Sequence, residues 1–487
     1  MSDAFPLGVL DSARAVAQGE VTAERLAQTH LERIEASDGD IRAFLHHDPE
    51  RVLERAREVD ALRSRGADLP PFAGVHIAVK DNLCTADSPT TCASRILEGY
   101  LPPYDAHVVE RLRAAGATII GKTNLDEFAM GSSTENSAYA TTCNPWDLER
   151  APGGSSGGSA AAVSAGMSAG ALGSDTGGSV RQPAAFCGIS ALKPTYGSVS
   201  RYGLVAFASS LDQVGAMAYS VADVAALHDS IAGFDPRDAT SLNREATSCL
   251  AAATAPAEGI RVGVWSGWLL EQIDDDARAA VQASRLALED AGATAVDIDL
   301  PHASLGVSVY YVLAAAEASS NLARFDGMRY GARASGKGLV ATYEATRGEG
   351  LGPEVKRRIL LGTHALSSGY YDALYNRAQR ARGAIRSDFA NAFASCDAIL
   401  SPTTPSAAFR LKEKSASPLS MYLADICTLP ASLAGLPAIS TPASLSGDGL
   451  PMGVQLVGQF HREDTLVTLA SAIEARCAIG HPGGETR

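Results

Sequence analysis

The amino-acid sequence predicts an α/β protein, and three observations support this fold class. Short apolar runs typical of buried strands alternate with longer segments of helical periodicity along most of the chain. The 487 residues are 46% hydrophobic and 20% charged, which is ordinary for a globular protein with a large core. Strand, helix and strand also follow one another at the spacing of parallel crossover units. We therefore expect one α/β domain over residues 1–487, although length alone would allow about three domains.

The N-terminal part of the chain, about residues 1–65, is predicted to be helical. Apolar residues recur with helical spacing in 21–36, where Thr22 is a plausible N-cap, and 49–65 is a charged surface helix. The next expected elements alternate, with a strand at 75–80, a helix at 105–115 and a strand at 118–121. This alternation is the first crossover unit of the predicted sheet.

The same alternation continues through the second half of the chain. Further short buried strands are expected at 260–265, 295–300, 398–401, 438–441 and 453–457. Helices are expected at 221–232, 274–291, 307–325, 354–393 and 464–477. The region from about 305 to 395 is therefore predicted to be a helical elaboration of the α/β domain.

Charge and cysteine content exclude several classes of function. The formal net charge is −14, and the longest basic run is only Lys356-Arg357-Arg358. Because phosphate neutralisation supplies most of the affinity for nucleic acid, we expect any RNA to be held by another chain. The eight cysteines form no Cys-x-x-Cys pair, which favours reduced thiols in a cytoplasmic protein. The N-terminus lacks the pattern of a signal peptide, and no stretch is apolar enough to predict a membrane span.

Two loops rich in glycine and serine, residues 153–159 and 173–179, are the most informative part of the sequence. They bracket a segment expected to be a buried helix that leads into a short strand. The first loop does not match a phosphate-binding loop, because Gly158 is followed by Ser159 instead of Lys. Its serines, Ser155 among them, could cap the following helix or take part in catalysis, and this loop alone does not decide between the two roles.

The second loop favours catalysis. Its two adjacent glycines precede Ser179 and let successive N–H groups point at one spot, as an oxyanion hole requires. Ser179 would then stand at the start of a helix, whose dipole adds positive potential. Helix capping is again the alternative, but a cap alone does not require the double glycine. The two loops together predict a serine nucleophile.

A serine nucleophile needs a base, and Lys80 is the better candidate. None of the ten histidines lies in either loop, and His76, on the strand before Lys80, is better explained as a core residue. A lysine at a strand end is usually a solvated charge, but the polar run after Lys80 indicates a turn at the carboxyl edge of the sheet. Lys80, Ser155 and Ser179 are therefore predicted to form a Ser-Ser-Lys system for amide hydrolysis.

These residues resemble the amidase signature family. After Lys80 the chain contains Gly-Gly-Ser-Ser-Gly-Gly-Ser and Gly-Ser-Asp-Thr-Gly-Gly-Ser-Val-Arg-Gln-Pro-Ala in the family's order, and the likeness covers nearly the whole chain. The resemblance implies that Ser179 forms the acyl intermediate, that Ser155, often held by a cis peptide, is the bridging serine, and that Lys80 is the base. It implies an oxyanion hole made by the N–H groups of Thr176, Gly177, Gly178 and Ser179. The implied fold is a central mixed, largely parallel sheet covered by helices on both faces.

This mechanism places a requirement on the pKa of Lys80. The amine must be neutral near neutral pH, so its pKa must fall from about 10.4 by about 3 units, or roughly 4 kcal/mol of differential stabilisation. Desolvation against the apolar strand and helix could supply this difference. We expect Lys80→Ala or Ser179→Ala to abolish hydrolysis.

Within the family, the chain is most similar to the A subunits of glutamyl-tRNA(Gln) amidotransferases. The similarity lies in the segments 309–312, 318–321, 356–359, 367–372 and 421–425. It implies that Arg358 binds the α-carboxylate of glutamine, that Asp425 binds the α-ammonium and that Tyr310 lines the pocket. A guanidinium and a carboxylate at opposite corners suit a free amino acid. Arg357 and Tyr311 are alternatives to their neighbours, and Asp425 could instead cap a helix.

The same resemblance implies partners. Such subunits are glutaminases that make ammonia for a B subunit, which uses ATP and Mg and carries tRNA, and a small C subunit completes the heterotrimer. The sequence has no Walker motif or metal cluster, so we expect no cofactor and no metal in this chain. These residues leave open whether Gln-tRNA or Asn-tRNA is the product. A free-standing amidase with another carboxamide substrate and a non-catalytic scaffold are the alternatives, and Tyr310, Arg358 and Asp425 discriminate against the first.

Overall fold

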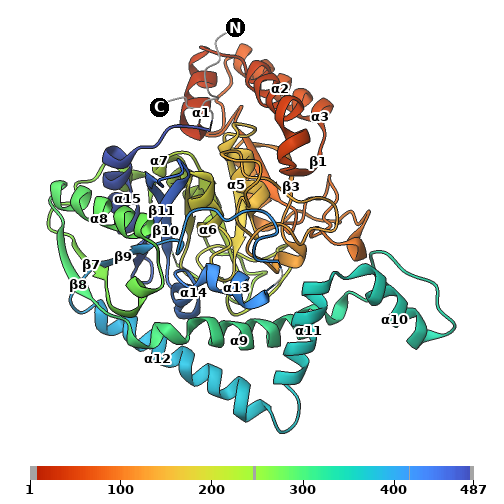
Figure 1. Cartoon of the computed structure of the whole chain (residues 1–487). Coiled ribbons are helices and arrows are strands. Elements are labelled where there is room, and N and C mark those ends of the chain that lie inside the picture. Colours follow the sequence, from red (N-terminus) through yellow and green to blue (C-terminus); the bar gives the residue numbers. More distant parts are fainter. Residues whose placement is uncertain (1–7, 245–247, 416, 483–487) are drawn as a thin grey trace.

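A computed structural model describes residues 8–244, 248–415 and 417–482 (Figure 1). Within these ranges, eleven strands form one sheet in the order β1-β3-β2-β4-β6-β5-β10-β11-β9-β7-β8. The strands are β1 (Phe44–His47), β2 (His76–Lys80), β3 (Thr118–Thr123), β4 (Gly170–Asp175), β5 (Ser190–Lys193), β6 (Gln213–Ala218), β7 (Arg261–Trp265), β8 (Thr294–Ile298), β9 (Ala398–Pro402), β10 (Ala438–Leu445) and β11 (Pro451–Gly458). The predicted α/β fold with a mixed sheet is confirmed.

The sheet is not largely parallel, which corrects that part of the expectation. Of the ten described strand pairs, only β2–β3, β2–β4, β7–β8 and β7–β9 are parallel. The other six pairs, which include all those at the centre of the sheet, are antiparallel. The reason is that β5 leads to β6, and β10 to β11, without a crossover helix, and such connections allow antiparallel pairing. The sequence patterns do not mark β5 or β6, so the parallel units outweighed them in the prediction.

Helices cover both faces of the sheet, as expected. One face carries α5 (Gly157–Ser164) and α6 (Arg181–Cys187), in which every residue is buried. The other face carries α7 (Val221–Ile231), α8 (Asp275–Asp290) and α15 (Glu463–Cys477), and α4 (His107–Ala114) packs against α7. Neighbouring residues of one strand belong to different cores: Ala171 lies in the core with α5, and Leu172 lies in the core with α7.

Three helices form the N-terminal part of the molecule, drawn in red in Figure 1: α1 (Val9–Gln18), α2 (Ala23–Ile41) and α3 (Pro49–Ser64). Thr22 caps α2 as predicted, because its hydroxyl accepts the N–H of Arg25 at 3.1 Å. Asp48 caps α3 in the same way. Apolar residues of α2 and α3 share the core of α5, so these helices extend the cover of that face.

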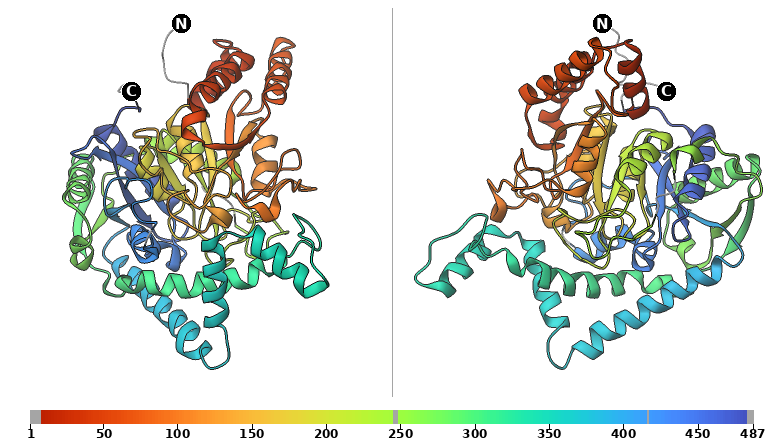
Figure 2. Two further views of the ribbon diagram at one scale, coloured as in Figure 1. Left: turned by 45° about the vertical axis from the view of Figure 1, so that its right-hand side comes forward. Right: turned by 180° about the vertical axis from the view of Figure 1, so that it is seen from behind.

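A helical arm lies along one edge of the molecule (Figure 2) and consists of α9 (Gly306–Asn321), α10 (Leu339–Gly350), α11 (Pro353–Ala365) and α12 (Arg377–Ala392). The single long helix expected at 354–393 is interrupted, because a turn and a π-helical segment, Tyr371–Asn376, separate α11 from α12. In the arm, α9 packs against both α11 and α12. Two short helices, α13 (Pro418–Tyr422) and α14 (Leu429–Ala434), fill the space between the arm and the sheet (Figure 1).

The structure also describes the cysteines and the apolar character of the helices. All eight cysteines are free thiols in the structure, and seven of them are buried. Within the three described ranges, no helix combines the length and the apolar character that crossing a bilayer requires.

Candidate active site

The candidate active site lies where two parallel strands end. Lys80 is the last residue of β2, and β4 ends at Asp175, two residues before the double glycine. Because β2 and β4 pair in parallel, their carboxyl ends meet at one edge of the sheet. α5 begins at Gly157, so the loop that precedes it brings Ser155 and Ser156 to the same place.

The amine of Lys80 is surrounded by hydroxyl groups. Its Nζ lies 2.8 Å from Ser155 Oγ, 2.9 Å from Ser156 Oγ and 3.0 Å from Ser174 Oγ. Lys80, Ser155 and Ser156 are wholly buried, and Ser174 is 2% exposed. The predicted contact between Lys80 and Ser155 is therefore present. Sequence analysis did not single out Ser156 and Ser174, although each lies within one of the two glycine-rich loops.

Burial is the main influence on the pKa of Lys80. Loss of solvent lowers this pKa to about 7, while the more distant carboxylates of Asp126, Asp175 and Asp212 act in the opposite direction. Near neutral pH a substantial fraction of the amine is therefore unprotonated. This agrees with the fall of about 3 pKa units that a lysine base requires.

The peptide bond between Gly154 and Ser155 is cis, the conformation that the family resemblance implied. Its surroundings are tightly built: Gly154 N–H donates to Gln182 Oε1 at 2.8 Å. A Cβ at Gly154 would lie 2.2 Å from Asp126 Oδ2, so no larger residue fits there. The first loop thus holds Ser155 in one position through its main chain.

The second loop provides fewer free N–H groups than the sequence predicts. Gly178 N–H donates to Asp175 Oδ1 at 2.8 Å, which corrects its assignment to the oxyanion hole. Within the described residues, the N–H groups of Thr176, Gly177 and Ser179 make no hydrogen bond and stay available. Glycine is required at 178, since φ there is 144° and a Cβ would lie 2.2 Å from Thr428 Oγ1.

A buried ion pair holds this loop. Arg181 Nε donates to Asp175 Oδ2 at 3.0 Å, and neither side chain is exposed. Burial acts to raise the pKa of Asp175, but Arg181, Lys193 and the N–H of Val180 together keep this pKa below its ordinary value. Arg181 also donates to Ser432 Oγ and Gln455 Oε1, so the loop is fixed to α14 and β11.

Ser179 differs from the other two members of the predicted triad. It is 7% exposed, whereas Lys80 and Ser155 are 0% exposed, so it is the one member of the three with any surface open to solvent. Its carbonyl accepts the N–H of Ser156 at 3.1 Å, which joins the two loops. The structure contains no hydrogen bond between the hydroxyls of Ser155 and Ser179.

The two candidate arginines differ in their exposure to solvent. The Arg357 side chain is 44% exposed, whereas that of Arg358 is 3% exposed and turns inward. Arg358 Nε donates to Glu354 Oε1 at 2.8 Å, and its guanidinium carbon lies 4.8 Å from the ring centre of Tyr311. Its terminal nitrogens make no hydrogen bond with the described residues, so they are free to bind a carboxylate in two-pronged fashion.

Both tyrosines of α9 lie at the site, but they face different parts of it. A Cβ at Gly177 would lie 2.9 Å from Tyr310 Cζ, so the ring of Tyr310 packs against the oxyanion loop. Tyr311 faces Arg358 and stacks on Tyr422 with 3.6 Å between ring centres. Tyr310 therefore stands where the pocket residue was predicted, and Tyr311 supports the arginine.

Asp425 is a buried carboxyl group and not a helix cap. It is 7% exposed, and Ser132 Oγ donates to its Oδ2 at 2.5 Å. Its Oδ1 is buried without a partner among the described residues. Burial raises the pKa of Asp425 to about 7, although Ser132 and Arg358 act to lower it. A buried acceptor of this kind is a place for a donor from a ligand.

Two more polar residues complete this side of the site. Glu354 accepts a hydrogen bond from Arg358 and another from the hydroxyl of Tyr422, whose oxygen lies 3.0 Å from Glu354 Oε1. Ser132 comes from the loop that follows β3, far from Asp425 in the sequence. Sequence reasoning missed Glu354 and Ser132. The sequence does contain a signal for Glu354, since this acidic residue stands one helical turn before the basic Arg358 and could pair with it. Nothing in the neighbouring sequence marks Ser132.

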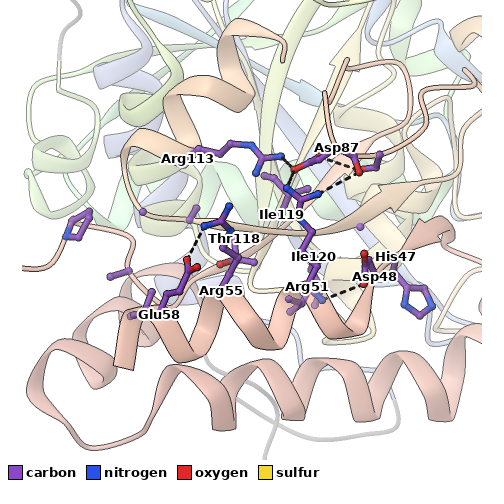
Figure 3. Close-up of a pocket in the computed structure, with 18 of the residues that line it drawn as sticks. His47, Asp48, Arg51, Arg55, Glu58, Asp87, Arg113, Thr118, Ile119 and Ile120 are labelled. Carbon is purple, nitrogen blue, oxygen red and sulfur yellow. Dashed lines mark hydrogen bonds and ion pairs between the residues drawn. The ribbon is translucent and has the colours of Figure 1, made fainter. Parts of the chain in front are cut away.

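A cavity of about 310 Å³ lies between α3 and β3 (Figure 3). Its charged side chains are paired with one another: Arg51 and Arg113 both contact Asp87, and Arg55 lies 2.7 Å from Glu58. Since these arginines already have carboxylate partners, they do not indicate an anion site.

One cluster among the described residues has the composition of a metal site. His228, Asp229 and Cys249 bring possible ligand atoms within 4.8 Å of one another. The Asp229 carboxylate, however, already accepts the N–H groups of Cys249 and Leu250, and burial raises the pKa of the Cys249 thiol. The carboxylate therefore caps the short helix at Leu250–Thr254, and we assign no metal to it.

Comparison with known proteins identifies the family of this chain. Residues 25–467 match the family described as Amidase. The chain belongs to the amidase family. The family resemblance of the two glycine-rich motifs is thereby confirmed.

Individual relatives are similar over almost their full length. The chain is 52% identical over 474 residues to the A subunit of glutamyl-tRNA(Gln) amidotransferase from Chloroflexus aggregans, with 97% of each chain covered. It is 55% identical over 470 residues to the protein of the same name from an Anaeromyxobacter species, with 96% of each covered. The crystal structure of the corresponding A subunit from Thermotoga maritima is 41% identical with a TM-score of 0.82, covering 100% of this chain and 99% of that one. The native peptide amidase from Stenotrophomonas maltophilia is 31% identical with a TM-score of 0.82, and 98% of each chain is covered.

Proposed function

We propose that this protein is the glutamine-hydrolysing A subunit of a tRNA-dependent amidotransferase. It would supply ammonia for the conversion of Glu-tRNA(Gln) to Gln-tRNA(Gln), and the same chemistry would serve Asp-tRNA(Asn). Support comes from the relatives, which carry the name of that subunit over nearly their whole length. The amidase family has members with other substrates, so the substrate must be argued from the site itself.

The observation that carries the substrate assignment is the pair of buried charged groups beside the oxyanion loop. Arg358 has free terminal nitrogens, and Asp425 has a free Oδ1, as described above. A free amino acid carries one carboxylate and one ammonium, which these groups would bind. Tyr310 would separate them from the reacting carboxamide. A simple aliphatic amide would leave both charges unpaired, which is costly in a buried site.

In the proposed mechanism, Ser179 Oγ attacks the side-chain carboxamide carbon of glutamine. The proton of Ser179 passes to Ser155 while the proton of Ser155 passes to neutral Lys80, so the new C–O bond forms without a free alkoxide. The N–H groups of Thr176, Gly177 and Ser179 would hold the oxyanion. Lys80 then returns a proton through Ser155 to the nitrogen, the C–N bond breaks, and ammonia leaves. Water hydrolyses the acyl ester to glutamate.

The hydroxyls around Lys80 support its role as the base. A neutral amine has two N–H donors and one lone pair. Ser156 Oγ donates its own hydrogen to Ser174 O at 3.1 Å, so it can only accept from Lys80. If Ser174 Oγ takes the second N–H, the lone pair is directed to Ser155 at 2.8 Å. This is the arrangement that a relay from Ser155 needs.

The proposal includes partners and excludes resident cofactors. A B subunit would bind tRNA and use ATP and Mg, and a C subunit would complete the heterotrimer in the cytoplasm. We propose that this chain itself holds no cofactor and no metal, because acyl transfer at Ser179 needs neither. Its formal net charge of −14 is consistent with tRNA bound through the partner.

The test is to purify the chain with whatever co-purifies from its native source and to measure amide hydrolysis. We expect two further chains to accompany it, and glutamine to be preferred over simple aliphatic and aryl amides. The Ser179→Ala variant, purified in the same way, should retain the partners and lose hydrolysis. A chain that purifies alone and prefers simple amides would instead be a free-standing amidase, and a Ser179→Ala variant with normal turnover would remove the mechanism.

A further inference from the structure

Among the described residues, Ser132 is the only side chain that donates a hydrogen bond to the carboxylate of Asp425. Its Oγ lies 2.5 Å from Asp425 Oδ2, and Ser132 is 2% exposed. The bond occupies one carboxylate oxygen and leaves Oδ1 buried and unpartnered among the described residues. Because rotation of the carboxylate would break the Ser132 bond, the free oxygen has a fixed direction.

The loop that carries Ser132 is itself rigidly held. The carboxylate of Asp126 accepts the N–H groups of Ser133 at 3.2 Å and Thr134 at 2.9 Å. Ser132 O accepts Gln182 Nε2 at 2.9 Å. The same Gln182 side chain receives Gly154 N–H, from the residue before Ser155. One side chain therefore fixes Ser132 in relation to the catalytic loop.

We propose that Ser132 is a positioning residue that determines specificity, because it orients Asp425 toward the α-ammonium of an amino-acid amide. This inference rests on the proposed function, in which Asp425 binds that ammonium. Its consequence is a preference for amides that carry an α-ammonium over otherwise identical amides that lack it. Ser132 does not touch the reacting atoms and should leave the chemistry of the Ser-Ser-Lys system unchanged.

The charges around Asp425 predict how loss of Ser132 would act. Burial raises the pKa of Asp425 to about 7, and the Ser132 hydrogen bond and Arg358 are the influences that oppose it. Asp175 and Asp126 raise the pKa further. The other titratable neighbours are Lys414, Tyr310, Tyr311 and Cys427. Without the Ser132 hydroxyl, Asp425 would take up a proton at higher pH, and a neutral carboxyl group binds ammonium poorly.

The experiment compares two substrates and two serine variants in the full chain with its co-purifying partners. The substrates are glutamine and glutaramate, which share the carboxamide and the carboxylate and differ in the α-ammonium. Ser132→Ala removes the hydroxyl under study. Ser133→Ala is the matched control, because Ser133 Oγ is buried in the same loop without a hydrogen-bond partner among the described residues.

We expect Ser132→Ala to lower kcat/KM for glutamine roughly tenfold to a hundredfold, as loss of a hydrogen bond to a charged group does. The loss should be larger at pH 6.5 than at pH 9, and turnover of glutaramate should change less than about twofold. Ser133→Ala should leave both substrates unaffected. Ser132→Cys, which keeps a weak donor, should lie between wild type and Ser132→Ala.

An equal loss for both substrates, or an unchanged preference for glutamine, would overturn the role of Ser132. The proposed function is judged separately, on the wild-type protein. If wild type does not prefer glutamine to glutaramate, Asp425 binds no ammonium, and both proposals fall. If wild type prefers glutamine and Ser132→Ala does not alter that preference, only the inference about Ser132 falls.

Discussion

Lys80 and Lys193 are two buried lysines at the ends of strands in the same sheet, and their surroundings differ in one respect. Both are at most 2% exposed, and burial lowers the pKa of each to about 7. Lys80 Nζ lies against three serine hydroxyls. Lys193 Nζ donates to the carbonyl of Pro194 at 2.9 Å, and no hydroxyl contacts it among the described residues.

The difference shows that a lowered pKa alone does not make a base. Desolvation prepares a neutral amine at both positions. Of these two lysines, only Lys80 has a hydroxyl group within hydrogen-bond distance that could transfer its proton to the amine. Only there does a glycine-rich loop place a second serine nearby. At Lys193 the neighbours are the charged groups Arg181, Asp175 and Glu463, of which Arg181 lowers the pKa further and the carboxylates raise it. Lys193 is therefore a core residue, and its low pKa results from its burial.

The largest expected effect comes from exchanging each lysine for methionine, which has a similar length and no charge. Lys80→Met should lower kcat for amide hydrolysis at least about a thousandfold, since base and proton relay are lost together. Lys193→Met should keep kcat within about threefold. Steady-state hydrolysis by the two purified variants measures both. A hundredfold loss of kcat in Lys193→Met would contradict this distinction between the two lysines, because it would show that Lys193 takes part in the reaction.

The second effect concerns stability and should be similar at both lysines. The pKa of each falls from 10.5 to about 7 on folding, so the unfolded chain binds more protons between these pH values. The free energy of unfolding therefore rises with pH across this window, and the penalty is largest at and below pH 7. Lys193→Met should stabilise the protein by about 2 kcal/mol at pH 7, with part of the gain offset by the lost bond to Pro194.

Denaturant unfolding of wild type and Lys193→Met at pH 7 and pH 10 tests this. The advantage of the variant should shrink at pH 10, where less of the penalty is present. Lys80→Met should likewise be more stable than the wild type, with a smaller gain at pH 10, although it lacks activity. This is expected when a group that destabilises the fold is kept for catalysis. A stability loss in Lys193→Met that is equal at both pH values would mean that packing, not desolvation, dominates at this position.

The sequence predicted the lysine–serine contact because its parts are local. Lys80 ends an apolar strand, and Ser155 and Ser179 stand in short glycine-rich motifs whose backbone chemistry is recognisable. Regular elements with clear periodicity, such as α8 and α15, were also predicted closely. The expectation of one domain over residues 1–487 stays a prediction.

Other features depend on contacts between distant segments, which no local pattern reports. The contact of Ser132 with Asp425 joins residues 293 positions apart. The loss of Gly178 from the oxyanion hole depends on where the carboxylate of Asp175 turns, which the double glycine does not reveal. β5 and β6 are short and built largely of small residues, so they lack the apolar contrast of β2 or β7. Their antiparallel pairing follows from the chain path, and periodicity does not encode it.

The smallest expected effect concerns the hydroxyl groups that contact Lys80. Below about pH 7, Lys80 becomes protonated, so kcat of the wild type should fall about tenfold per pH unit. Ser174 Oγ accepts from Lys80 and so favours its charged form. Ser174→Ala should therefore lower the pKa of Lys80 and move this acid limb down by about half a pH unit. Lys193→Met should not move it, because Lys193 is not among the charges that act on Lys80. A pH profile of kcat for the three proteins distinguishes these outcomes, and an acid limb that follows Lys193 instead of Ser174 would reverse the assignment of the base.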